Sequence, residues 1–252
     1  MNYVQTITKG ALRLGTLAVV LATVSVIAQA DPVVLGQVDT FQSGPQGWLI
    51  GFGPGPQPRT PLPVVIGGGP GGAGDNYLLI SGTGVREVGG SVSAINDTQW
   101  TGNYLAAGVN AITMDVINFG PSNLALRLIV VGPFGPTGPQ NIAFSTDAIF
   151  LPAGSGWTSL TFLIGPEHLT AARGTAVGAL TNAGAMRLYH NPAPGFGGRD
   201  NGPPPVDADL GVDNITATAV PEPATMILLA TGLAGVAAKV RKRRKARHTE
   251  EA

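Results

Sequence analysis

Apolar and polar residues alternate along the middle of the chain with a period of two. The clearest runs are residues 112–116, 124–130 and 160–164, where every second position is apolar. Such alternation is typical of strands that bury one face in a core. Further strands are expected at residues 47–52, 77–81, 141–150, 186–190 and 211–219. We therefore expect about eight to ten strands, with no pattern of helical crossovers between them.

Turn-forming residues separate these runs. The chain of 252 residues holds 37 glycines and 21 prolines, with clusters at residues 53–56, 67–74 and 202–205. Many short strands joined by such turns predict an all-β fold, an antiparallel jelly-roll sandwich. Only residues 167–177 are expected to form a short helical turn. Because the chain contains no cysteine, neither a disulfide nor a thiol nucleophile is available.

The formal net charge of zero hides an uneven distribution of charge. The lysines all lie in the terminal segments, at Lys9, Lys239, Lys242 and Lys245. Between Asp31 and Ala219, six arginines face about twice as many acidic residues, so this part is anionic. Phosphate binding needs clusters of Lys and Arg, which argues against nucleic acid as a partner. A hard cation such as calcium is compatible with this charge.

The first thirty residues have the layout of a secretory signal. Lys9 and Arg13 precede the apolar residues 14–27, and Ala28-Gln29-Ala30 follows with small side chains at both flanking positions. A basic start, a short apolar core and such a site predict a signal peptide over residues 1–30 that signal peptidase removes after Ala30. The alternative is an uncleaved anchor helix, although the apolar run is shorter than the roughly 20 residues of a spanning helix.

A different arrangement ends the chain. Pro221-Glu222-Pro223 precedes the apolar residues 224–238, a basic cluster and the polar tail 248–252. The cluster consists of Arg241, Lys242, Arg243, Arg244, Lys245 and Arg247, after Lys239. We expect a short transmembrane helix, with the cations stopping transfer on the cytoplasmic side. Since proline cannot continue a helix upstream, Glu222 is expected to be extended and reachable outside the membrane.

This order of motif, apolar helix and basic cluster resembles the PEP-CTERM sorting signal of exported proteins in Gram-negative bacteria. The resemblance implies a sorting signal over residues 220–247 and cleavage near the motif by an exosortase, a membrane-embedded cysteine transpeptidase. The protein would be exported across the inner membrane, anchored there transiently, and then released to the cell surface or the extracellular space. A permanent anchor that is never cut is the alternative, because a stop-transfer helix has the same sequence pattern.

Residues 31–219 form the ectodomain, whose landmarks resemble the galactose-binding-like sandwiches that include many carbohydrate-binding modules. The landmarks are residues 39–41, 47–48, 74–78, 126–128, 156–157 and 211–215. The resemblance implies that the first and last strands lie close together and hold a structural calcium, with Asp39 and Asp213 as carboxylate ligands. Alternatively, Asp213 caps the last strand and Asp39 is solvated.

Two aromatic residues are candidates for stacking on sugar rings. Trp100 and Tyr104 lie in the polar segment 96–104, and an aromatic face matches the apolar face of a pyranose. Burial of both in the core is the alternative. Trp48 and Trp157 sit beside glycines within strand patterns, and we expect both in the core.

No arrangement typical of an active site accompanies these features. The sequence lacks a G-x-S-x-G elbow, and its three histidines, His168, His190 and His248, have no nucleophile placed near them by a motif. We therefore expect a non-enzymatic surface protein whose ectodomain binds extracellular polysaccharide. A structural protein that associates with itself and a hydrolase of matrix glycans are the alternatives.

Overall fold

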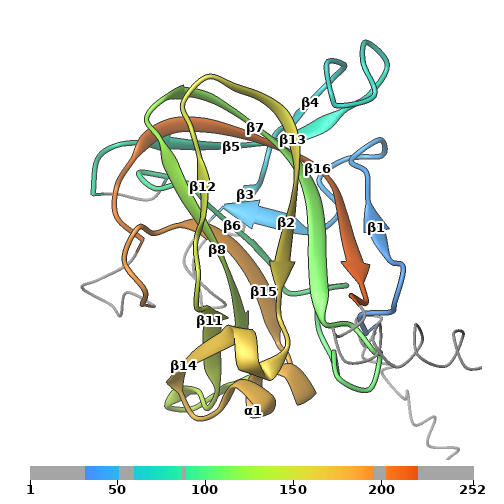
Figure 1. Cartoon of the computed structure of the whole chain (residues 1–252), viewed down its shortest axis with the longest axis vertical. Helices are drawn as coiled ribbons and strands as arrows, with labels where there is room; N and C mark the ends of the chain where they lie inside the picture. The colour runs from blue at the N-terminus through green and yellow to red at the C-terminus, as the bar shows by residue number, and fades with distance from the viewer. Residues whose placement is uncertain (1–31, 51–59, 87–88, 196–202, 221–252) are drawn as a thin grey trace, which may run out of the picture.

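A computed structural model describes residues 32–50, 60–86, 89–195 and 203–220 (Figure 1). The predicted signal-peptide residues Ala28 and Ala30, the motif 221–223 and the basic cluster lie outside these ranges. Within them, no helix has the length and hydrophobicity needed to cross a bilayer.

Two antiparallel sheets make up the ectodomain. The first sheet has the order β13 (Ser155–Leu163), β7 (Ala111–Pro121), β16 (Asp207–Thr218), β5 (Tyr77–Thr83) and β4 (Val64–Val65), and β1 (Val38–Asp39) also pairs with β16. The second sheet has the order β14 (Leu169–Arg173), β11 (Ile142–Ser145), β8 (Leu124–Val131), β15 (Ala185–His190), β6 (Ser93–Asn96), β2 (Trp48–Ile50) and β3 (Thr60–Pro61), and β12 (Ile149–Leu151) pairs with β8. A small hairpin joins β9 (Phe134–Gly135) to β10 (Gly138–Pro139).

The chain passes repeatedly from one sheet to the other. Successive strands β5, β6, β7 and β8 alternate between the sheets, as do β12, β13 and β14, and β15 leads into β16. Such crossings between two packed sheets give a sandwich of the jelly-roll kind. The predicted all-β antiparallel sandwich is confirmed.

The alternating runs of the sequence form the inner faces of both sheets. Ile112, Met114 and Val116 of β7 are at most 1% exposed, and Leu124, Leu126 and Leu128 of β8 are fully buried. A fully buried side chain of this size contributes about 1.5–3 kcal/mol relative to an exposed one. The period of two therefore identified both core-facing strands correctly.

Strand β8 is also buried on its other face, where alternation predicts a polar and exposed surface. Ile129 is fully buried and belongs to a second apolar cluster with Phe144 and Tyr189. Arg127, the register partner of Tyr189, is only 4% exposed. Its Nε donates to the Asn191 carbonyl at 3.0 Å, and Nη1 donates to the carbonyls of Ser145 and Thr146 at 2.8 and 2.7 Å. Backbone carbonyls thus stabilise a charge that the pattern places in solvent.

The helical turn predicted at residues 167–177 is only partly correct. The structure has a short 3-10 turn η1 (Pro166–His168), then strand β14, then helix α1 (Ala176–Thr181). The middle of the segment pairs with β11 at the edge of the second sheet, and this pairing takes the place of a helix. Helix α1 starts after Thr175, whose Oγ1 accepts a hydrogen bond from the Gly178 amide at 2.9 Å.

Candidate functional site

A buried carboxylate joins the first strand to two tryptophans of the core. Asp39 Oδ2 accepts hydrogen bonds from Trp48 Nε1 at 2.7 Å and from Trp100 Nε1 at 2.6 Å. Gln99 Nε2 donates to both Asp39 oxygens, at 3.2 and 3.1 Å. Asp39 is 3% exposed and both indoles are fully buried. This group is a structural clamp, because its polar atoms satisfy one another inside the core.

The clamp corrects two expectations from the sequence. Trp100 and Tyr104 are both fully buried, so neither presents a ring face to a ligand. The Tyr104 hydroxyl donates to the Trp100 carbonyl at 2.9 Å, and burial followed by the charge of Asp39 raises the pKa of that hydroxyl. Asp39 accepts N–H donors at the inner face, which gives it a structural role instead of the predicted role as a metal ligand. Trp48 lies in the core, as expected.

Asp213, unlike Asp39, is buried without a well-formed hydrogen bond. Its side chain is fully buried, and neither carboxylate oxygen has a hydrogen-bond partner. Asp115 on β7 is its direct cross-strand neighbour. Burial is the largest cause that raises the pKa of Asp213, to about 7; a contact with the Asn214 backbone opposes it, and the charges of Asp75 and Asp115 and a contact with the Asp75 side chain add to it. Like charges facing each other across a strand pair are destabilising unless a proton or a cation neutralises them.

Local hydrogen bonds hold the two neighbouring carboxylates in place. Asn214 Nδ2 donates to Asp115 Oδ2 at 2.9 Å, and the Ser159 hydroxyl bonds to Asp115 Oδ1. Asp75 accepts from Gln42 Nε2 and from the Gly71 amide, both at 2.6 Å. Asn214 adopts a left-handed backbone (φ 50°), where the pairing of β16 with β7 shifts register. Asp213 follows the inward-facing Val212 and lies on the outer face beside Asp115, and the irregularity after it returns Ile215 and Ala217 to the core.

The carboxylates around Asp213 could hold a hard cation only together with other oxygen ligands. Among the described residues, no three Asp, Glu, His or Cys side chains form a group that could hold a metal ion. Two orphaned carboxylate oxygens on a buried Asp213 are nevertheless the kind of ligand that calcium prefers. Backbone carbonyls or water molecules would have to complete the coordination of such an ion.

Three aromatic residues form a second feature on the outer face of the first sheet. Tyr77 of β5 lies 6.1 Å from Phe119 of β7 and 5.3 Å from Trp157 of β13 between ring centroids, the latter pair at 77°. Phe119 is 49% exposed, Trp157 is half-buried, and Tyr77 is 8% exposed. We call these three residues the aromatic surface. Trp157 Nε1 donates to the Gly68 carbonyl at 3.0 Å, which fixes its indole plane.

The backbone beneath the aromatic surface is glycine for a steric reason. A Cβ on Gly211 would lie 2.6 Å from Ile117 Cγ2 and 3.1 Å from the Tyr77 ring. The absence of a side chain on Gly211 therefore lets the Tyr77 ring pack closely against β16. Asp209 on β16 is the register partner of Gly120, the residue directly after Phe119, and it is exposed on the same sheet. Burial, followed by the negative charge of Asp209, raises the pKa of Tyr77.

Sequence reasoning missed this surface. Tyr77 was expected only within a strand and a fold landmark, Phe119 was given no role, and Trp157 was expected in the core. The alternation along β13 did indicate an outward position for Trp157. Leu160 and Phe162 face the core, and Trp157 alternates with them on the same side as Ser159 and Thr161. Aromatic rings of this kind can stack on the apolar face of a sugar. The neighbouring carboxylate can accept hydrogen bonds from the hydroxyl groups of the sugar.

Residues 219–244 match the PEP-CTERM protein-sorting motif. The match begins two residues before Pro221, spans the apolar stretch and ends at Arg244 within the basic cluster. The chain carries a PEP-CTERM sorting signal. This signal indicates an exported protein that is processed by an exosortase and sorted through the membrane to the cell surface. The recognition made from Pro221, Glu222 and Pro223 is thereby confirmed.

Solved structures with a similar arrangement of strands include carbohydrate-binding modules. A family 11 carbohydrate-binding module from Clostridium thermocellum, in complex with a β-1,3-1,4-mixed-linked tetrasaccharide, is 16% identical with a TM-score of 0.47, over 75% of this chain and 99% of that one. The family 11 module of a cellulosomal cellulase from the same organism is 14% identical with a TM-score of 0.45, over 75% and 98%. An exo-β-agarase is 12% identical with a TM-score of 0.46, over 75% and 25%. No curated protein matches the chain. Similarity at this level assigns no ligand to the ectodomain.

Proposed function

We propose that this protein is exported, sorted by its PEP-CTERM signal, and binds polysaccharide at the cell surface or in the extracellular matrix through the aromatic surface. The observation that carries the binding proposal is the exposed aromatic group on the outer face of the first sheet, next to Asp209. Phe119 and Trp157 offer ring area to solvent, and the Trp157 hydrogen bond to Gly68 keeps its plane fixed. Rigid, partly exposed rings lose little conformational entropy on binding.

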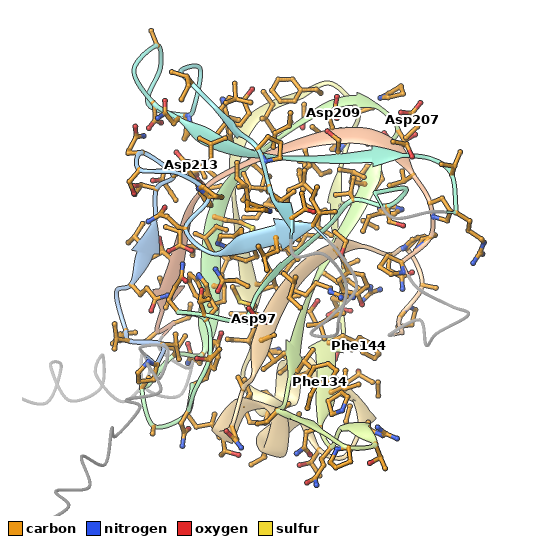
Figure 2. The ribbon with its side chains drawn as sticks, turned by 180° about the vertical axis from the view of Figure 1, so that it is seen from behind. Asp97, Phe134, Phe144, Asp207, Asp209 and Asp213 are labelled. Carbon is orange, nitrogen blue, oxygen red and sulfur yellow. The ribbon has the colours of Figure 1, made fainter. Side chains whose placement is uncertain are left out.

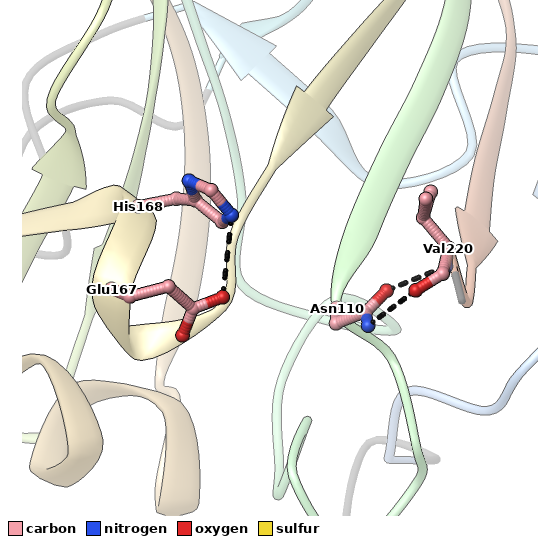
Figure 3. Close-up of polar contacts among 4 residues, drawn as sticks. All are labelled: Asn110, Glu167, His168 and Val220. Atoms are coloured by element: carbon pink, nitrogen blue, oxygen red, sulfur yellow. Dashed lines mark hydrogen bonds and ion pairs between the residues drawn. The ribbon is translucent and has the colours of Figure 1, made fainter. Parts of the chain in front are cut away.

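A non-catalytic role agrees with the environment of the two described histidines. His190 Nδ1 accepts a hydrogen bond from the Ala125 amide at 2.9 Å, and burial lowers the pKa of its imidazole. His168 lies 3.3 Å from Glu167 on the exposed turn η1 (Figure 3). Both have local partners, and we assign neither to a reaction. Release of reducing ends from a bound polymer would favour the hydrolase alternative.

Binding is tested with intact protein in detergent and an array of polysaccharides that includes mixed-linkage β-glucan, agarose and xylan. Phe119→Ala and Trp157→Ala are each expected to weaken binding about tenfold or more, because each removes ring area from the contact. Phe150→Ala is the matched control, since Phe150 on β12 of the second sheet is 64% exposed and lies outside the aromatic surface. Equal losses in all three variants, or no binding to any polymer, would contradict the proposal.

We further propose that a calcium ion neutralises Asp213, with Asp75 or Asp115 as a second carboxylate ligand. The two orphaned oxygens and the raised pKa of Asp213 support a cation at this position. Such an ion would stabilise the junction between β16, β7 and the loop that carries Asp75. It would take no part in a reaction.

A further inference from the structure

One end of the ectodomain carries a group of exposed apolar side chains. They are Val34 (56% exposed), Leu35 (53%), Val38 (42%), Leu105 (38%), Leu163 (38%) and Val220 (40%). We call these six residues the apolar rim. They come from the N-terminal turn, β1, the loop before β7, the end of β13 and the last described residue.

Backbone contacts bring these segments together around the end of β16. Val38 is the register partner of Thr216, and the Gly36 amide beside Leu35 donates to the Ala217 carbonyl at 2.8 Å. Leu163 is the register partner of Ala111, which in turn pairs with Thr218. These contacts place the N-terminal turn, β1 and the end of β13 beside the end of β16, where the chain leaves the sandwich.

The last described residue is fixed by an amide side chain (Figure 3). Asn110 Nδ2 donates to the Val220 carbonyl at 2.9 Å, and the Val220 amide donates to Asn110 Oδ1 at 2.7 Å. The Asn110 amide itself donates to the Thr218 carbonyl at 3.1 Å, and its carbonyl accepts from Ile164 at 2.8 Å. The sandwich thus extends to Val220, the residue directly before the sorting motif.

Only Pro221, Glu222 and Pro223 separate this fixed point from Ala224, the first residue of the apolar stretch. Four fully extended steps span at most about 14 Å. The headgroup layer on one side of a bilayer is about 5–8 Å thick. With the apolar stretch inserted, the end of the sandwich must lie at the headgroups.

Two exposed carboxylates of β16 lie far from this end. Asp207 and Asp209 lie at the start of β16, and the rim surrounds its end, which the strand length places roughly 35 Å away. Figure 2 shows the labelled Asp207 and Asp209 at the far end of the molecule from the end of β16. An anionic leaflet at the rim would therefore not repel these two carboxylates. Glu167, whose side chain is 62% exposed and which follows Leu163 by four residues, is the acidic residue on the rim side.

We propose that the apolar rim docks on the outer surface of the membrane while the sorting tail is still inserted. Lipid is the partner, and Val34, Leu35 and Leu105 enter the boundary between headgroups and acyl chains. The inference depends on the sorting tail and is independent of polysaccharide binding. Docking in this orientation holds Glu222 at the membrane surface, and it directs the end of β7 that carries Phe119 away from the bilayer.

The chain lacks cysteine, so single labels can be introduced without background. Full-length protein with Leu35→Cys, Leu105→Cys or Leu163→Cys, carrying an environment-sensitive fluorophore, is reconstituted in vesicles of phosphatidylethanolamine and phosphatidylglycerol. We expect quenching by lipids brominated near the headgroup to be at least twofold stronger than at the control labels Val85→Cys and Phe150→Cys. Quenching by iodide in the aqueous phase should be weaker at the rim labels than at the control labels.

Equal quenching by brominated lipid at the rim and control labels would overturn the proposal. Removal of the protein from the vesicles by alkaline carbonate would also overturn it, because the tail would then not be inserted in the membrane. A second variant tests the role of the rim itself. Val34→Asp with Leu35→Asp, both exposed positions, should reduce lipid quenching at Leu163→Cys while the protein resists carbonate. Unchanged lipid quenching in this variant would mean that the short link between Val220 and the apolar stretch alone holds the label near the membrane. That result would also overturn docking through the rim. The quenching experiment involves no polysaccharide, so a failure of the polysaccharide-binding proposal would be a separate result.

Discussion

Asp39→Ala is expected to lower the free energy of unfolding by about 3–5 kcal/mol. The substitution leaves the N–H groups of Trp48 and Trp100 buried without an acceptor, and each orphaned donor costs about 1–3 kcal/mol. Gln99 loses a partner as well. Urea denaturation followed by tryptophan fluorescence measures the loss, and two of the three indoles of the chain report directly on the clamp.

Two further substitutions make this result specific. Asp39→Asn keeps one carbonyl oxygen as acceptor and should lose less stability than Asp39→Ala. Asp209→Ala removes an exposed carboxylate and should change the free energy of unfolding by no more than about 0.5 kcal/mol. A loss below 1 kcal/mol for Asp39→Ala would mean that the clamp contributes little, contrary to its burial.

Asp213 is expected to make the stability of the calcium-free protein fall between about pH 4 and pH 7. Its pKa rises from the ordinary 3.8 to about 7 in the folded state, so in this window the folded protein binds a proton that the unfolded chain releases. Stability therefore declines as the pH rises, by up to about 1.4 kcal/mol for each pH unit. Asp213→Asn carries no titrating group and should show a flatter profile and greater stability at pH 8 in chelator.

If calcium binds Asp213, it should make the unsubstituted protein more stable than Asp213→Asn at pH 8. Added calcium is expected to raise the melting temperature of the unsubstituted protein at pH 8, because the ion binds the folded state and neutralises the ionised carboxylate of Asp213. Asp213→Asn should respond much less, while Asp209→Asn, an exposed control on the same strand, should respond fully. Equal responses of all three proteins would place any calcium elsewhere, and no response of the unsubstituted protein would argue against the ion.

The fold could be predicted because its core follows a strict period of two. Residues 112–116 and 124–130 present Leu, Ile, Val and Met at alternate positions, and a sandwich is the common way to bury such faces. The second buried face of β8 could not be predicted in the same way. Arg127 interrupts the apolar pattern, and its carbonyl partners at Ser145, Thr146 and Asn191 become visible only when the chain is folded.

The candidate site was less accessible to sequence reasoning because its contacts join distant segments. Trp100 donates to Asp39 across 61 positions, and the polar residues around Trp100 suggested exposure instead. The pairing of Asp213 with Asp115 depends on strand register, which the sequence does not determine by itself. The sorting tail was recognised because its signal is local and its parts follow one another directly.

In the proposed functions, the rim and the aromatic surface serve at two different ends of the molecule. Val220 and the rim lie where β7 begins at Ala111, and Phe119 lies near the opposite end of the same strand. A sandwich resting on the membrane through the first would present the second outward, toward a surrounding polymer. Cleavage near Glu222 would then release the ectodomain without disturbing the aromatic surface.

Export and cleavage of the tail are tested most directly by mass spectrometry of the intact protein recovered from its own cells. The account predicts that the chain begins at Asp31 and ends near the motif at residues 221–223, without the apolar stretch and the basic cluster. Recovery of a cytosolic protein with Met1 and Ala252 both retained would contradict it.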